Sequence, residues 1–144
     1  MPAGTFTLTV TGTGEDAAVL GVMEIRTTPK GTQAGYSYEN KEHWEDRVTL
    51  HLVDDAAAQE AAAVALRAWR ALRCRDGGRV DLRGDARGHP QFLEVNPLAG
   101  LNPEHSDLCF LARFKDLSYQ DLIGLIMASF LKRHPELAYA RAAA

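Results

Sequence analysis

Two short segments in which polar and apolar residues alternate constrain the fold of this chain most. They are residues 78–83 and 92–96, and residues 84–90 between them are rich in Gly, Asp and Pro. Successive side chains of a strand point to opposite faces, and such a connection favours a tight turn, so we expect an antiparallel hairpin. One face of it would carry Arg79, Asp81, Glu94 and Asn96, and the other would carry Val80, Leu82, Leu93 and Val95.

The polar face of this hairpin has two interpretations. Two carboxylates and an amide that share a surface repel one another unless a cation or a basic group lies between them. Oxygen ligands of this kind suit Mg²⁺, and the arginine beside them could hold charge on a phosphoryl group. The alternative is a solvated face with a cross-strand Arg–Glu pair, which stabilises a sheet by about 0.2–1 kcal/mol.

The same alternation predicts three further strands, at residues 5–11, 17–25 and 47–53. In the first of these, threonines alternate with Phe, Leu and Val, which predicts a strand with one buried face. Residues 12–16 contain a Gly-x-Gly without the Lys-Ser/Thr of a phosphate-binding loop, and they are expected to form a hairpin turn. Residues 26–46 contain Pro and several Gly and are expected to form a loop.

Helices are expected in three places. Residues 56–73 lack Gly and Pro and follow Asp54 and Asp55, which suit an N-cap. A second helix should run to about residue 114 and a third from about residue 118 to 133, the latter with Ser118 and Asp121 in a capping box. Residues expected to pack inward are Ala65, Leu66, Trp69 and Leu72 in the first helix, and Leu122, Ile123, Ile126, Met127, Phe130 and Leu131 in the last.

Together these elements predict one α+β domain over residues 1–144, with a mainly antiparallel sheet covered by helices and a flexible tail at 135–144. The formal net charge of −3 gives no reason to expect nucleic acid as a partner. Two cysteines, Cys74 and Cys109, are too few for a disulfide framework and are expected to be buried thiols. With no apolar run long enough for a signal or a membrane span, we expect a cytoplasmic protein without membrane contact.

Residues 78–106 read GRVDLRGDARGHPQFLEVNPLAGLNPEHS. This run resembles the C-terminal part of the D-alanine–D-alanine ligase family of ATP-grasp enzymes, in which Arg-x-Asp, a hairpin, Glu-x-Asn and a Gly-containing turn precede a His-Ser pair. The resemblance implies the C-terminal lobe of the ATP-grasp fold. It also implies ATP and two Mg²⁺ ions, or Mn²⁺ in their place, with Asp81, Glu94 and Asn96 as metal ligands.

The resemblance also implies roles for individual residues. Arg79 would stabilise the transferring phosphoryl group, and Lys41, in a Tyr-rich loop at residues 35–42, would face the phosphates. Gly100 would offer its N–H to the tetrahedral centre, and Ser106 would hold the carboxylate of the second D-alanine, with His105 beside it as a further substrate-binding residue. The alternatives are an exposed loop lysine for Lys41 and a helix N-cap for Ser106.

Three positions depart from the family pattern. Thr5 stands where the family has a Glu that meets the nucleotide ribose, Glu42 where it often has Tyr, and Ala99 where Pro is frequent.

The implied reaction joins a carboxylate to an amine, both from D-alanine in the family, through an acyl phosphate. The resemblance covers only the last part of the family pattern, so we expect a lobe that is incomplete on its own. A homo-oligomer, or a partner chain that supplies the missing lobe, would complete it. Two alternatives remain open: a non-catalytic binding or assembly module that kept the fold, and an ATP-grasp ligase for a different amino acid or peptide.

Overall fold

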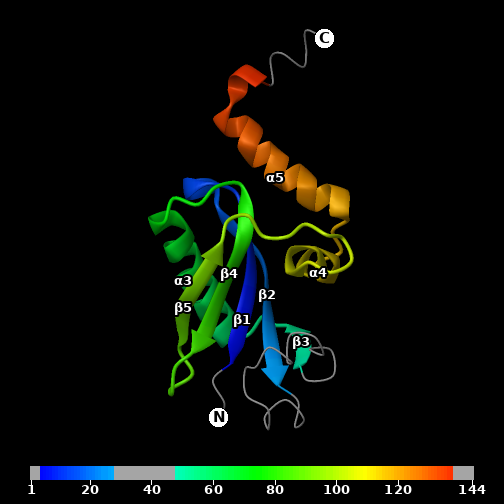
Figure 1. Ribbon diagram of the computed structural model, residues 1–144. Coiled ribbons are helices and arrows are strands. Elements are labelled where there is room, and N and C mark those ends of the chain that lie inside the picture. The colour runs from blue at the N-terminus through cyan, green and yellow to red at the C-terminus, as the bar shows by residue number, and fades with distance from the viewer. Residues whose placement is uncertain (1–3, 28–47, 138–144) are drawn as a thin grey trace.

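A five-stranded antiparallel sheet forms the centre of the computed structural model, which describes residues 4–27 and 48–137 (Figure 1). The strands are β1 (Thr5–Thr11), β2 (Ala18–Thr27), β3 (Val48–Leu52), β4 (Gly77–Gly84) and β5 (Pro90–Asn96). They lie in the order β3-β2-β1-β4-β5, so β1 is central. The helical elements are η1 (Gly14–Asp16), α3 (Ala56–Ala71), α4 (Asp107–Phe114) and α5 (Tyr119–Arg133). The predicted α+β class with an antiparallel sheet is confirmed.

Helix α3 covers one face of the sheet and forms the main core with it. Apolar residues of β1 and β4 pack there against the small side chains of the helix and Trp69, which is completely buried. Asp55 caps α3, because its side chain accepts a hydrogen bond from the N–H of Ala58 at 2.9 Å. Leu72, predicted to pack inward, follows the last residue of α3 and is 56% exposed.

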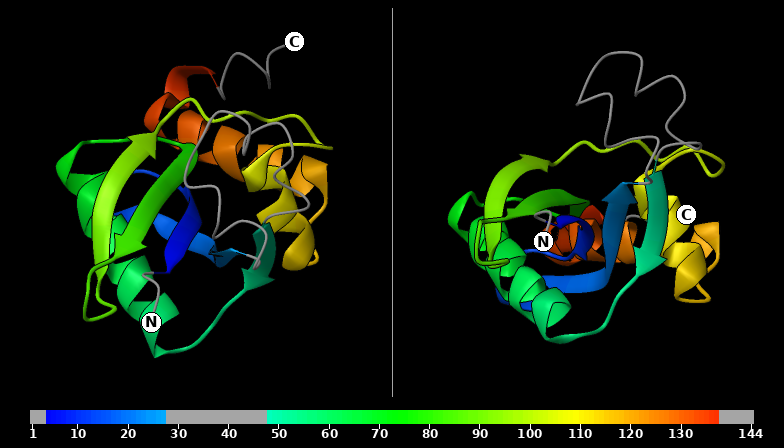
Figure 2. Two further views of the ribbon diagram at one scale, coloured as in Figure 1. Left: turned by 60° about the horizontal axis from the view of Figure 1, so that its bottom comes forward. Right: turned by 90° about the horizontal axis from the view of Figure 1, so that it is seen from below.

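Helix α4 covers the opposite face of the sheet (Figure 2). The expectation that β1 has only one buried face therefore changes. A Cβ added at Gly21, the partner of Thr9 on β2, would lie 3.0 Å from the side chain of Leu111 in α4. Thr7, Thr9 and Thr11 are therefore buried, although the alternation predicts one buried face. That prediction was wrong because a central strand between two helix layers has no solvated face.

Helix α5 lies across the end of the sheet that carries the β1–β2 turn (Figure 1). Its predicted capping box is present, since Ser118 and Asp121 exchange side-chain and backbone hydrogen bonds. Of its predicted apolar stripe, Leu122 is fully buried, whereas Met127 is 46% exposed. The expectation that Met127 fills the core was wrong. Residues 135–137, placed in a flexible tail from sequence, form a further helical turn, and 138–144 lie outside the described residues.

Candidate functional site

The four polar residues predicted to share a surface stand opposite one another on β4 and β5. Arg79 pairs with Asn96, and Asp81 pairs with Glu94, in the register of the antiparallel ladder. Directly opposite residues point to the same face of a sheet, so the predicted clustering is confirmed. These residues lie on the same face of the sheet that α4 covers over β1 and β2. Toward β5 this face is open to solvent, since the Glu94 side chain is 66% exposed.

The hairpin departs from strict alternation at one point. The register shifts between Asp81 and Leu82, so that Leu82 stands opposite Phe92 and Leu93 is an extra residue on β5. Leu93 is 55% exposed, which contradicts its predicted place in the apolar layer. A bulge of this kind ends the two-residue period without an obvious signal in the sequence.

The guanidinium of Arg79 contacts three carboxylates at once. Its Nε donates to Asp81 Oδ2 at 2.9 Å and its Nη1 to Asp107 Oδ2 at 3.0 Å, while its Nη2 lies 3.7 Å from Glu94 Oε1. Burial lowers the pKa of Arg79, but the charges of Asp81 and Asp107 outweigh this, and the pKa is raised. Sequence reasoning missed Asp107. Its one signal is its place directly after the His-Ser pair, at the expected start of a helix.

Asp81 is the most buried acidic group of the site. Its Oδ1 accepts a hydrogen bond from the hydroxyl of Thr7 at 2.9 Å, and Thr7 is its direct partner on β1. Burial raises the pKa of Asp81 above its ordinary value and Glu94 adds to this, while Arg79 and the Thr7 hydrogen bond act in the opposite direction. A cation beside Asp81 and Glu94 would therefore relieve an existing electrostatic cost.

The residues predicted to meet the second substrate lie in the loop before α4. A Cβ added at Gly100 would lie 3.0 Å from Ser106 Oγ, so these two residues are adjacent. Ser106 Oγ accepts a hydrogen bond from the N–H of Asn102 at 2.8 Å. Ser106 is the residue before α4, as the N-cap alternative predicts, but its side chain makes no capping bond.

The start of α4 brings this loop to the hairpin. Asp107 is the first residue of α4 and directly follows Ser106, so its contact with Arg79 places Ser106 beside the polar face. His105 is not held in the same way. Its side chain is 78% exposed, and its Nε2 lies 3.9 Å from Glu104.

These contacts do not test the predicted role of Lys41 or the predicted binding of a metal ion. Lys41 lies outside the described residues. In residues 4–27 and 48–137, no group of three or more His, Cys, Asp or Glu side chains could hold a metal ion. The predicted ligand set contains two carboxylates and an amide, and the hard oxygen donors of this set fit Mg²⁺. Thr5, predicted to stand in place of the family's Glu, begins β1 opposite Arg83.

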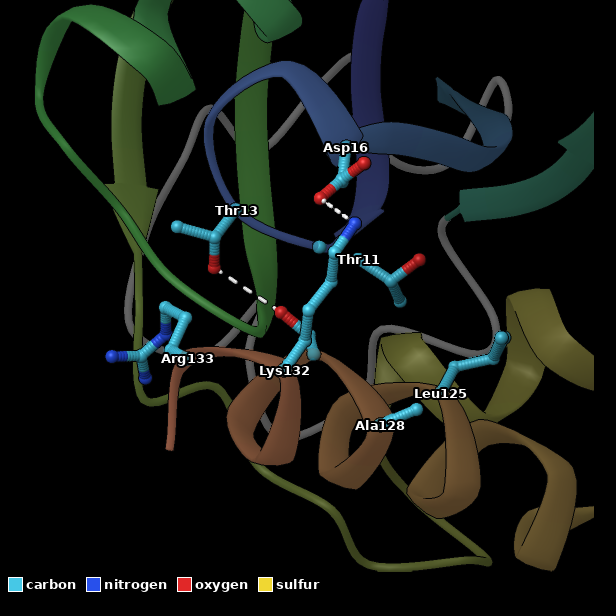
Figure 3. A pocket seen from close by; sticks show the side chains of 9 residues that line it. Thr11, Thr13, Asp16, Leu125, Ala128, Lys132 and Arg133 are labelled. Atoms are coloured by element: carbon cyan, nitrogen blue, oxygen red, sulfur yellow. Dashed lines mark hydrogen bonds and ion pairs between the residues drawn. The ribbon is translucent and has the colours of Figure 1, made fainter. Parts of the chain in front are cut away.

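A hollow lies between α5 and the β1–β2 turn, apart from the polar residues of the hairpin (Figure 3). It has a volume of about 500 Å³, and its rim carries an ion pair between Lys132 and Asp16 at 2.6 Å. A further ion pair joins Arg133 to Asp76 in the turn before β4, at 2.5 Å. Because these basic groups already have acidic partners, we assign no ligand to this hollow.

Comparison with known proteins identifies the family of the chain. Residues 3–128 match the family described as the D-ala D-ala ligase C-terminus. The chain belongs to this family. It is 36% identical over 131 residues to the D-alanine–D-alanine ligase of Bordetella petrii and 33% identical over 134 residues to that of Cupriavidus necator. These matches cover 89% and 90% of the chain.

Solved structures show the same fold. D-alanine–D-alanine ligase from Bacillus anthracis, in a crystal structure with ATP, has a TM-score of 0.67 at 19% identity and covers 94% of this chain. VanG D-Ala:D-Ser ligase from Enterococcus faecalis has a TM-score of 0.64 at 19% identity and covers 88% of it. The chain therefore has the fold of the C-terminal lobe of ATP-grasp ligases.

The matched region is a limited part of each relative. The chain spans 39% of the length of the two curated relatives and 40% of the B. anthracis chain. In the parts that the structure describes, no helix is long and apolar enough to cross a membrane.

Proposed function

We propose that this chain is the ATP- and magnesium-binding lobe of a ligase that joins a carboxylate to an amine, as in D-alanine–D-alanine ligases. The observation that carries the proposal is the pairing of Asp81 with Glu94 and of Arg79 with Asn96 on one face of the hairpin. A scaffold has no need for two carboxylates in direct opposition, since like charges placed opposite each other destabilise a sheet.

Asp81, Glu94 and Asn96 are the residues that would hold Mg²⁺, with two ions expected and Mn²⁺ as a substitute. The metal would neutralise charge on the phosphates of ATP and on the phosphoryl group in transfer. Contacts within the protein hold the carboxylates of Asp81 and Glu94 in place for metal binding. Thr7 and Arg79 hold the two oxygens of Asp81, and Glu94 is carried on the neighbouring strand.

Arg79 would neutralise the phosphoryl group as it passes from ATP to an oxygen of the first substrate's carboxylate, which yields ADP and an acyl phosphate. The amine of the second substrate then attacks the carbonyl carbon, loses a proton and expels inorganic phosphate, which leaves an amide bond. Removal of one such charge-stabilising donor lowers the rate by about 100-fold or more. Lys41, which lies outside the described residues, is proposed to contact the phosphates.

The loop before α4 is proposed to bind the second substrate. The N–H of Gly100 would face the oxygen that gains negative charge at the tetrahedral centre. Ser106 would donate its hydroxyl to the substrate carboxylate, with His105 beside it. With D-alanine as both substrates, the product is the dipeptide used in cell-wall peptidoglycan. The rest of the site would come from another lobe, since the relatives are more than twice as long as the part matched here.

Calorimetric titration of Mg-ATP into the chain tests the proposal. The wild-type chain is expected to release or absorb binding heat, and Glu94→Ala is expected to weaken binding by about tenfold or more, as for altered metal ligation. Glu15→Ala is the matched control, because Glu15 is an exposed acidic residue of η1 and belongs to neither strand of the hairpin. Absence of binding in the wild type, or equal affinity in all three proteins, would overturn the proposal.

A further inference from the structure

We propose that Asp107 is a positioning residue for Arg79, and that this contact couples the loop of the second substrate to the metal face. The inference rests on the proposed function, because it takes Asp81 and Glu94 as the metal ligands. It concerns a residue that the family pattern of Arg-x-Asp, Glu-x-Asn and His-Ser does not include.

The Arg79 guanidinium distributes its contacts over three carboxylates. Each of its three nitrogens faces a different carboxylate, and Asp107 takes Nη1 at 3.0 Å, a distance close to that of Asp81 from Nε. The side chain of Arg79 is 26% exposed, and that of Asp107 is 34% exposed. Both groups are thus screened from water in part, and the planar guanidinium is held at two edges at once.

A bound cation would change the surroundings of Arg79. Asp81 and Glu94 lie on the paired strands and would share their oxygens between the metal and Arg79. Asp107 belongs to α4, is 28 residues from Arg79 in sequence, and stands outside the proposed ligand set. It is therefore the carboxylate that keeps Arg79 in place when the other two are shared with a cation.

The Arg79–Asp107 contact also links the two parts of the site. The loop before α4 is held together by local bonds, such as Asn102 N–H to Ser106 Oγ and Glu104 N–H to Asn102 Oδ1. The Arg79–Asp107 pair extends from the end of this loop to β4. A shift of the loop when the second substrate binds would thus move Asp107, and with it the arginine that faces the phosphoryl group.

A purely local role for Asp107 is the competing explanation, because an acidic residue in the first turn stabilises a helix. Nitrogen-15 NMR of the Arg79 guanidinium distinguishes positioning of Arg79 from this local role. In the wild-type chain without ligands, Nη1 and Nη2 are expected to give separate signals, because the ion pair slows rotation of the group. In Asp107→Asn they are expected to merge. Asp116→Asn makes the same change of charge beyond the other end of α4 and should leave them separate.

Rescue and affinity complete the test. Asp107→Glu is expected to restore separate signals, because it returns a carboxylate to Nη1 of Arg79. For Mg-ATP, Asp107→Asn should weaken binding by about two- to fivefold, the range of a partly exposed ion pair. Unchanged Arg79 signals in Asp107→Asn, or an affinity equal to that of Asp116→Asn, would overturn the inference. If the wild type binds no Mg-ATP, the proposed function fails, and the NMR signals alone still decide whether Asp107 positions Arg79.

Discussion

Two threonines on β1 show how much the role of a residue depends on its neighbour. Thr7 and Thr9 face the same side of the sheet and are both buried. The hydroxyl of Thr7 donates to Asp81, whereas the hydroxyl of Thr9 has no hydrogen-bond partner among the described residues. The repeating Thr-x-Thr sequence predicts the same environment for both threonines. Their roles differ because the register with β4 places only Thr7 opposite Asp81.

This difference predicts opposite effects of one isosteric substitution. Thr7→Val should lower the free energy of unfolding by about 1 kcal/mol, because it leaves an oxygen of the buried Asp81 carboxylate without its donor. Thr9→Val should leave the stability unchanged or raise it, because it removes a buried polar atom without a partner. Urea unfolding at neutral pH measures both, and equal losses in the two variants would contradict this account.

The candidate site was predictable from sequence where local rules connect its residues. Arg79, Asp81, Glu94 and Asn96 lie on two strands joined by a short turn, so alternation and the turn fix their common face. Asp107 was not predictable, because its distance from Arg79 depends on how α4 packs on the sheet. The exposure of Leu93 was not predictable either, because a bulge interrupts the alternation there.

Among the elements, α5 relies on polar contacts more than its sequence predicts. At its C-terminal end, Asp76 accepts hydrogen bonds from Arg133, Ser129 and Thr13. Asp76 also has a backbone φ of +66°, which Asp and Asn tolerate better than most residues. The helix was predictable from its capping box and apolar period, but its attachment was not, because these partners are far apart in sequence.

Asp76→Asn is expected to lower the free energy of unfolding at pH 7 by about 1–2 kcal/mol, because it keeps the turn geometry but removes the charge that Arg133 pairs with. Burial acts to raise the pKa of Asp76, but the hydrogen bonds from Arg133 and Ser129 outweigh it and lower the pKa. The stability from this carboxylate is therefore present above its unfolded-state pKa and is lost as pH falls through the folded-state value.

Urea unfolding at a series of pH values checks this, and the difference from wild type should shrink in acid. Asp16→Asn is the matched control, since the Lys132–Asp16 pair holds the same helix but both side chains are at least 60% exposed. It should change the stability by less than about 1 kcal/mol. A difference between Asp76→Asn and wild type that persists at low pH would contradict the assigned role.

In the whole molecule, the sheet order and the two helix layers bring the parts of the site to one face of the sheet. Strands β4 and β5 supply the charged residues, and the chain between β5 and α4, which contains Gly100 and Ser106, crosses from these strands to α4 (Figure 1). This architecture was predictable as a class, because the strand and helix periods are clear. The side of the sheet that α4 covers was not predictable, because β1 offers a threonine face that resembles a solvated one.

An NMR titration of the chain with Mg-ATP, monitored by backbone and arginine side-chain signals, tests the hairpin site most directly. Shifts are expected to concentrate at Arg79, Asp81, Glu94 and Asn96 and to extend to the start of α4. Absence of shifts, or shifts confined to the hollow beside α5, would contradict the assignment of the hairpin as the nucleotide and metal site.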